Sequence, residues 1–380
     1  MGAAGYSSPS GNVGKPVDFG RYSRRERSLS SRLNSIVRFA TKRTMNLEPI
    51  DPETAVELYI AEKETELAKA SIRSHRSRLG HFVRWCAERE IDNLNDLTGR
   101  KLHEFRLWRR NDGNLNKVSV KTQTDTLRVF IRWLGSIDGV DPELHVKVLS
   151  PAVTPDENSR DVKLEKDDAE AILAYLGKYE YATLPHVTVA LLWHTMMRLG
   201  AAHALDVSDY HPEGQYLEVV HRPETDTPIK NGHDGERFIG LSGWLCTLLD
   251  DWLRDCRPDV TDEFGRQPLL ATAQGRIART TITRYSYQYT RPCVIGAECP
   301  HERDLEACEG TTTGGYSKCP SSVSPHAIRR GSITHHLTKD IPEIVVSDRA
   351  NVSQRVLEQH YDRRSEREKM EQRRQYLDKL

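Results

Sequence analysis

Three residue types near the end of this chain could act together on one phosphate group. His326 and Arg329 stand three positions apart, and Tyr361 follows further along the chain. An imidazole can move a proton, a guanidinium can bind two phosphate oxygens at once, and a phenol can attack phosphorus. If the three share a site, the chain holds the groups needed to cut DNA without a metal.

The spacing of His326 and Arg329 predicts a helix that presents both side chains on one face, since residues three apart are neighbours there. Ser324 and Pro325 support this start, because serine is a good N-cap and proline is favoured in the first helical turn. The free N–H groups at such a helix start also attract anions. On its own, this pattern also fits a surface helix with two solvated polar residues.

The same residues resemble the C-terminal box of the tyrosine recombinases, the phage-integrase family, including archaeal members with a cysteine-bearing insert. The segment His194–Asp209 resembles the family's first arginine box, in which Arg198 matches the catalytic arginine. Thr227–Gly232, followed by Arg237–Leu241, resembles the β-hairpin that carries the catalytic lysine, matched by Lys230. The order of these boxes is more specific than any one of them.

The sequence departs from the family pattern at two places. Ala201 stands where the family usually has an acidic residue, three positions after the first arginine. Val352 stands where it usually has a histidine or tryptophan, nine residues before the tyrosine. Arg349, Asn351 and His360 are the polar substitutes nearby, and no spacing argument selects among them. We take Arg349 as the candidate.

The resemblance implies a site-specific recombinase that cleaves and rejoins double-stranded DNA through a 3′-phosphotyrosyl intermediate. Arg198 and Arg329 would hold the phosphate, and Tyr361 would attack it. Lys230 would protonate the leaving oxygen, and His326 would move the other proton. No cofactor would be needed for catalysis, and the chain would assemble on DNA as a dimer or tetramer. Two alternatives remain open, a type IB topoisomerase and an accessory DNA-binding protein that has lost catalysis.

Each candidate also has an ordinary structural interpretation. Arg198 could cap a helix C-terminus, where the helix dipole favours a cation. Lys230 could be a solvated turn residue, because the Asn-Gly pair that follows it is a strong hairpin signal. Tyr361 could be a half-buried tyrosine whose hydroxyl bonds to the backbone. The joint order of the four motifs favours the catalytic interpretation.

Cysteines form a second pattern, because four of the seven fall within one short window that also contains His301. The four are Cys293, Cys299, Cys308 and Cys319. A loop-rich insert with few apolar residues needs a bound metal or a crosslink to be ordered. Four soft ligands suit a structural zinc. The spacings are not those of the common C-x-x-C pairs. Disulfides, disfavoured in the cytosol, and unliganded thiols are the alternatives.

Charge points to local rather than global DNA contacts, since Lys+Arg and Asp+Glu both total 55. Residues 1–48 form a basic arm with the composition of a disordered segment, which could bind phosphates or act as a solubilising tail. The candidate DNA-binding residues are Arg24, Arg25 and Arg27 in the arm and Arg73, Arg76, Arg78 and Lys121 beyond it. No long apolar run or signal-peptide core is present, which favours a cytoplasmic, nucleoid-associated protein with no membrane partner.

The elements that must position these residues are mainly helical, with a small β-sheet, so the expected class is α+β. Helical spacing predicts helices over 55–68, 71–89, 98–110 and 119–134, which resemble the family's core-binding domain (49–150), with N-caps at Asp51, Ser71, Thr98 and Ser119. A Pro-bearing polar linker (151–161) precedes a catalytic domain (162–365) with a Cys-rich insert at 291–320. Further helices are expected over 166–179, 185–198, 243–256 and 280–289, strands over 215–221 and 237–241, and a charged C-terminal helix over 366–380.

Overall fold

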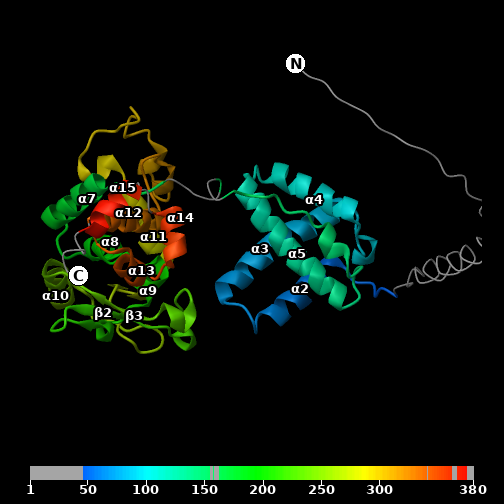
Figure 1. The fold of residues 1–380 in the computed structure, drawn as a ribbon, viewed down its shortest axis with the longest axis horizontal. Coiled ribbons are helices and arrows are strands. Elements are labelled where there is room, and N and C mark those ends of the chain that lie inside the picture. Colours follow the sequence, from blue (N-terminus) through cyan, green and yellow to red (C-terminus); the bar gives the residue numbers. More distant parts are fainter. Residues whose placement is uncertain (1–45, 155–156, 158–161, 340, 362–365, 375–380) are drawn as a thin grey trace, which may run out of the picture. The chain divides into compact units, whose positions relative to one another are not determined.

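The computed structural model describes residues 46–154, 157, 162–339, 341–361 and 366–374 (Figure 1). The chain divides into two compact units, Met1–Thr154 and Pro155–Leu380, and this boundary falls inside the segment interpreted as a linker. Arg24, Arg25 and Arg27 of the basic arm lie outside the described residues. No helix in the described ranges is long and apolar enough to cross a membrane.

Over the described residues 46–154, the first unit is a bundle of four helices. They are α2 (Pro52–Lys63), α3 (Lys69–Glu88), α4 (Gly99–Asp112) and α5 (Lys117–Ser136), with short 3₁₀ turns at Leu94–Asp96 and Leu144–Lys147. Phe82, Trp85, Phe105 and Phe130 are buried in its core, and the rings of Phe82 and Phe105 meet edge to face at 5.3 Å. The predicted helical spacing therefore reflects one shared apolar core.

Two of the four predicted N-caps in this unit are correct and two are wrong. Asp51 accepts a hydrogen bond from the N–H of Thr54, and Thr98 accepts one from Lys101. Helix α3 begins after Ala68, without a side-chain cap, rather than at Ser71. Helix α5 is capped by Asn116, whose side chain accepts from the N–H of Ser119. Ser119 therefore donates to the cap and is not the cap itself. Asparagine is at least as favourable as serine at an N-cap position.

The second unit is mainly helical, in agreement with the expected class. Its larger helices are α7 (Lys166–Tyr179), α8 (Leu184–Thr195), α10 (Gly243–Asp251), α11 (Arg279–Tyr289) and α12 (Pro325–Leu337), and its short ones are α9 (Leu199–Ala204), α13 (Glu343–Ala350), α14 (Gln354–His360) and α15 (Glu366–Arg374). A π-helical turn, Trp252–Cys256, continues α10. Helices α13 and α14 are absent from the prediction because each is too short to show a periodic pattern.

A three-stranded antiparallel sheet lies beside these helices. The strands are β1 (Tyr210–His211), β2 (Tyr216–Val219) and β3 (Arg237–Gly240), in the order β1-β2-β3. Leu217 is the central pair residue, opposite Tyr210 on one side and Ile239 on the other. All three are buried, so one face of the sheet packs on the core. A separate two-stranded ribbon pairs β4 (Ala271–Thr272) with β5 (Gly275–Arg276).

The helix predicted over 185–198 is broken before its end. Helix α8 stops at Thr195 because Met196 adopts a left-handed conformation, with φ of 54°, and α9 starts at Leu199. A left-handed conformation is uncommon for a residue with a large side chain. Met196 is held in it at a fully buried position, where its carbonyl accepts a hydrogen bond from Arg329. The break places Arg198 at the start of α9.

Candidate active site

Arg329 lies at the centre of the second unit. Helix α12 begins as the sequence predicts, with Ser324 as N-cap and Pro325 in the first turn. Only 1% of Arg329 is exposed, and its guanidinium donates to the carbonyls of Met196 and Ala350, the latter at 2.7 Å. Burial, and then the neighbouring charge of Arg198, lower the pKa of Arg329 to about 9. The group stays charged at neutral pH, in a place that favours an incoming anion.

Arg198 lies close to Arg329 and occupies the N-cap position of α9. Its Nη1 donates to the side-chain oxygen of Asn351 at 3.2 Å. Burial lowers the pKa of Arg198, and the nearby phenol of Tyr361 acts in the opposite direction. Position 201, on the same short helix, is a buried alanine. Support for this arginine therefore comes from Asn351, 153 positions further along the chain.

Tyr361 lies at the end of α14 and is 6% exposed. Its phenol is close enough to both Arg198 and Arg329 to raise their pKa values. Its backbone carbonyl accepts a hydrogen bond from the hydroxyl of Thr334 on α12, and its side chain belongs to a small apolar cluster with Leu357 and Val352. The structure thus brings Arg198, Arg329 and Tyr361 together.

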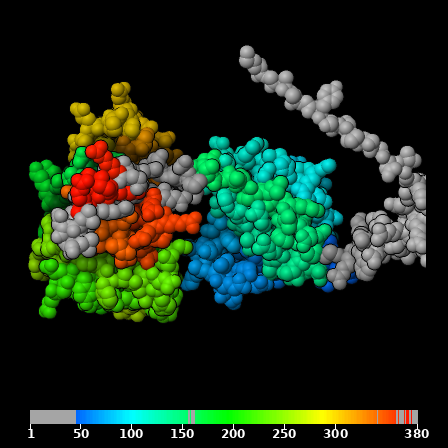
Figure 2. Space-filling view, viewed as in Figure 1, coloured from blue at the N-terminus to red at the C-terminus, as the bar shows by residue number. Residues whose placement is uncertain are grey.

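Lys230 lies on the connection between β2 and β3, in the hairpin position that the sequence indicates, and its side chain is exposed. Asn231 follows it in a left-handed conformation with φ of 75°, and a 3₁₀ turn, Gly232–Gly235, leads into β3. The side-chain amide of Asn231 donates to the side-chain oxygen of Asn351 at 2.8 Å. This contact ties the lysine-bearing hairpin to the end of α13. Figure 2 shows α13 and α14 (orange) beside the hairpin segment (light green) on one face of this unit.

His326 occupies the first turn of α12, one turn before Arg329, and its side chain is exposed. Residues three apart on a helix share a face, so the imidazole and the guanidinium lie on the same side of α12. The imidazole is thus open to solvent, whereas the guanidinium three residues later is buried.

Arg349 donates its hydrogen bonds to backbone carbonyls of two other elements. Its guanidinium donates to the carbonyls of Gly240, at 2.6 Å, and His194, at 2.9 Å, so it joins α13 to β3 and α8. Burial lowers its pKa. Both contacts occupy donors that a phosphate would otherwise use. That Arg349 takes the role of the family's histidine or tryptophan therefore stays a prediction. Its described contacts are those of a residue that links three elements of the fold.

Sequence reasoning missed Arg237 as part of this site. It begins β3, donates through Nε to the carbonyl of Arg349 at 3.0 Å, and through Nη1 to the carbonyl of Gly235 at 2.8 Å. Burial, followed by the charges of Arg198 and Arg349, lowers its pKa to about 10. The sequence signal that could have indicated Arg237 was a cation at the first position of the second strand of the hairpin.

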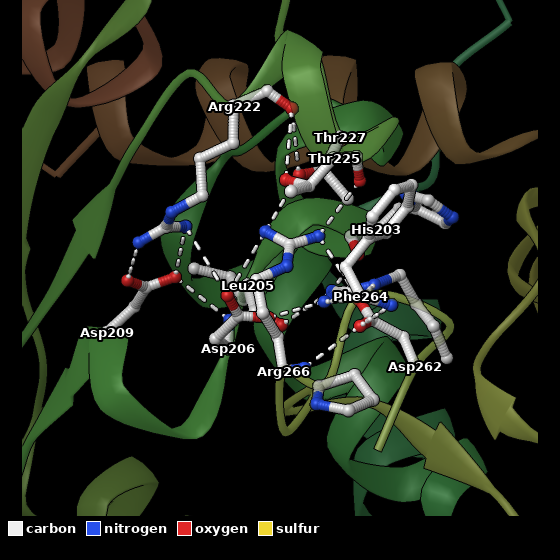
Figure 3. Close-up of polar contacts among 12 residues, drawn as sticks. His203, Leu205, Asp206, Asp209, Arg222, Thr225, Thr227, Asp262, Phe264 and Arg266 are labelled. Atoms are coloured by element: carbon white, nitrogen blue, oxygen red, sulfur yellow. Dashed lines mark hydrogen bonds and ion pairs between the residues drawn. The ribbon is translucent and has the colours of Figure 1, made fainter.

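Ion pairs hold the base of the hairpin to the end of the first arginine box (Figure 3). Asp209 receives both terminal nitrogens of Arg222, at 3.0 and 2.6 Å, directly after β2. Asp206 pairs with Arg266 at 3.2 Å and with Arg276. Asp206 and Asp209 are 4% and 2% exposed, and buried charges are retained where they are paired and hydrogen-bonded. The aspartates that end this box therefore have a structural task, which is to fix the hairpin relative to α9.

The candidate DNA-binding residues of the first unit have the following contacts. Arg76 pairs with Glu57 at 2.5 Å, and Lys121 pairs with Asp125 at 2.5 Å. Arg78 donates to the hydroxyl of Thr126 at 3.1 Å, whereas the side chain of Arg73 is exposed. Exposed pairs of this kind contribute little to stability, so the cations can exchange their partners for phosphate oxygens.

The four cysteines of the insert line one pocket together with His301. A Cβ atom at Gly310 would lie 3.2 Å from the Cβ of Cys319 and 3.5 Å from the sulfur of Cys308, so these two thiols flank one glycine. His301 bonds to the hydroxyl of Ser321 at 2.7 Å. Among the described residues, no three His, Cys, Asp or Glu side chains approach closely enough to hold a metal ion. The structural zinc expected from these cysteines therefore stays a prediction.

The geometry places three guanidinium groups beside the phenol of Tyr361. Arg198, Arg237 and Arg329 lie within electrostatic reach of one another. Their hydrogen-bond acceptors are neutral oxygens, and none of the ion pairs found among the described residues joins one of these three arginines to a carboxylate. A phosphate diester would supply the missing negative charge, and guanidinium groups match its oxygens. The phenol of Tyr361 lies next to this position.

Comparisons with known proteins identify the family of the chain. The family model described as "Phage integrase, N-terminal SAM-like domain" matches residues 56–136. The N-terminal domain of a phage integrase/site-specific recombinase from Haloarcula marismortui is 38% identical over 27% of this chain and 99% of that domain, with a TM-score of 0.27. The chain belongs to the tyrosine recombinase, or phage-integrase, family.

Two further solved structures show the shared fold over most of the chain. The Tn1549 transposon integrase in complex with a circular intermediate DNA has a TM-score of 0.58 at 12% identity, covering 84% of this chain and 99% of that one. A lambda integrase dimer bound to a COC′ core site has a TM-score of 0.57 at 14% identity, covering 84% and 97%. No protein with a curated description matches the chain.

Proposed function

We propose that this protein is a site-specific DNA recombinase that cleaves and rejoins strands through a 3′-phosphotyrosyl intermediate. The observation that carries the proposal is the convergence of Arg198, Arg237 and Arg329 beside the phenol of Tyr361. Burying cations without a carboxylate partner costs free energy, and such sites are kept where a ligand supplies the opposite charge.

In the proposed reaction, Arg198 and Arg329 bind the non-bridging oxygens of the scissile phosphate. The Tyr361 oxygen forms a bond to phosphorus, and the bond from phosphorus to the 5′ oxygen breaks. Lys230 gives its proton to that leaving oxygen, while His326 takes the phenol proton. Attack by the 5′ hydroxyl of another strand reverses these steps and joins new partners. The covalent link stores the energy of the broken bond, so the proposal includes neither ATP nor a divalent metal.

The proposed partner is double-stranded DNA, on which the chain would assemble as a dimer or tetramer. The support for assembly is the similar fold of the lambda integrase, which was crystallised as a dimer on its core site. Exchange of strands between two duplexes requires at least two active sites, one for each strand that is cut. A protein of this function would work in the cytoplasm, at the nucleoid.

A covalent-trapping experiment tests the proposal and does not require a defined DNA target. The full chain is incubated with a library of nicked duplexes of random sequence, and complexes that resist detergent are isolated and sequenced. We expect an adduct on Tyr361, identified by mass spectrometry of the crosslinked peptide. An adduct on another residue, such as Tyr376, would overturn the assignment.

The Tyr361→Phe variant completes this test, because it removes only the hydroxyl. It should give no adduct while it keeps its affinity for the recovered DNA. DNA binding by the wild type with no adduct would favour the accessory-protein alternative. Relaxation of a supercoiled plasmid that lacks the recovered site would favour the topoisomerase alternative.

A further inference from the structure

The end of helix α13 is a left-handed turn with an asparagine at its tight position. Asn351 has φ of 49°, its N–H bonds to the carbonyl of Asp348, and the N–H of Val352 bonds to the carbonyl of Ser347. This pair of hydrogen bonds is the Schellman motif, whose left-handed residue is usually glycine. Asparagine also tolerates the conformation, and it adds a side-chain amide that glycine lacks.

Three successive residues of this turn each accept a hydrogen bond from a different arginine. The carbonyl of Arg349 accepts from Arg237 at 3.0 Å, and the carbonyl of Ala350 accepts from Arg329 at 2.7 Å. The side-chain oxygen of Asn351 accepts from Arg198 at 3.2 Å. The last carbonyls of a helix lack partners within it and carry partial negative charge, so they are suitable acceptors for guanidinium groups.

The amide of Asn351 has a second set of contacts, to the hairpin. Its oxygen also accepts from the amide of Asn231 at 2.8 Å, and its nitrogen donates to the carbonyl of Asp234 at 2.9 Å. Both of these residues belong to the hairpin that carries Lys230. One side chain therefore contacts the arginine of the first box and the segment that presents the lysine.

We propose that Asn351 is a positioning residue that orients Arg198 and couples it to the Lys230 hairpin, in place of the acidic residue that the family usually has at position 201. This inference rests on the proposed function. An amide differs from a carboxylate in an important way, because it holds the guanidinium without cancelling its charge. The full charge of Arg198 then remains for the phosphate, as expected of a preorganised electrostatic site.

The substitution Asn351→Gly tests this role with the smallest disturbance of the fold. Glycine is the preferred residue at the left-handed position, so we expect the melting temperature to stay within a degree or two of wild type. The rate of single-turnover cleavage should fall by about ten- to a hundredfold, as for the loss of a hydrogen bond to a charged group. Affinity for the nicked duplex recovered from the random library should change by less than about threefold, because Arg329 and the other cations remain.

Two matched variants separate the contacts. Asn351→Asp keeps an acceptor for Arg198, so it should cleave faster than Asn351→Gly. Asn231→Gly keeps the contact between Asn351 and Arg198 and removes only the amide of the hairpin. A substrate whose leaving 5′ oxygen is replaced by sulfur needs little protonation, because a thiolate is a good leaving group. On it the Asn231→Gly defect should disappear, whereas part of the Asn351→Gly defect should remain.

Several results would overturn the inference. One is cleavage by Asn351→Gly at the wild-type rate, and another is a parallel loss of melting temperature, binding and cleavage, which would indicate a purely structural role. No recovery in Asn351→Asp would also count against it. The wild type is assayed first, since absence of its covalent adduct would overturn the proposed function, whereas full activity of Asn351→Gly overturns only the role of this residue.

Discussion

Three histidines that are buried or half-buried should make the second unit sensitive to mild acid. His186, His194 and His203 lie on or next to α8 and α9, and burial lowers the pKa of each from 6.5 to about 4. The further causes are the charges of His336, Arg349 and His335 for His194, and mainly those of Arg279 and Arg276 for His203. Ring nitrogens of His186 and His203 are buried without a hydrogen-bond partner, which agrees with neutral rings.

The sign and size of the effect follow from proton linkage. Each folded pKa lies below the unfolded value of 6.5, so the unfolded chain binds more protons between pH 6.5 and pH 4. The stability that these groups contribute is complete above pH 6.5 and is lost as the pH falls toward 4. The contribution of each histidine to the free energy of unfolding falls by up to about 1.4 kcal/mol per pH unit. The three contributions together fall by up to about 4 kcal/mol per pH unit.

Urea unfolding of the full chain between pH 7.5 and 4.5, with peptide mapping by pulse proteolysis, measures this slope separately for residues 162–339. The His203→Gln variant removes one of the three protons and should reduce the slope by about a third. A free energy of unfolding of the second unit that does not change between pH 6.5 and 5, or an equal slope in the variant, would refute the assignment of neutral rings in the folded state.

Three further predictions concern catalysis, DNA binding and packing. Arg329→Lys should slow cleavage by at least about a hundredfold while changing DNA affinity much less, because lysine lacks the planar fork and leaves one buried carbonyl unpaired; single-turnover rates and binding titrations measure both. Neutralising Arg24, Arg25 and Arg27 together should weaken binding and flatten its salt dependence, by up to about 0.9 log units for each phosphate that is no longer neutralised, with cleavage of bound DNA unchanged. Gly331→Ala should lower the unfolding free energy of the second unit by about 3 kcal/mol in urea titrations, because a Cβ there would overlap the carbonyl oxygen of Leu164.

Local patterns predicted much of the fold. The helix expected over 166–179 coincides with α7, and the start of α12 follows from Ser324 and Pro325. The strands expected over 215–221 and 237–241 correspond to β2 and β3, each somewhat shorter. These elements could be predicted because periodicity and capping are properties of neighbouring residues.

Other features depend on contacts between residues that are far apart in the sequence, so no local sequence pattern indicates them. At the break, the carbonyl of Met196 accepts a hydrogen bond from Arg329, which stands 133 positions later. The hydrogen bonds from Asn351 to Arg198 and Asn231 span 153 and 120 positions. The sequence marked Asn351 as one of three candidates for a missing role, and only tertiary geometry distinguishes it from Arg349, whose guanidinium donates to two backbone carbonyls.

The residues around the candidate nucleophile form an apolar cluster of their own. They are separate from the larger core of the second unit, and the buried members are Met196, Ile333, Leu337, Val346, Ala350, Val352, Leu357 and Tyr361. A segment with a small core of its own can open locally while the rest stays folded. The hydrogen bonds from Arg198 and Arg329 oppose that opening. A phosphate bound by Arg329 would compete with the carbonyl of Ala350 for that guanidinium. DNA binding should then weaken the contact of α12 with α13, which would couple the arrival of DNA to local opening around Tyr361.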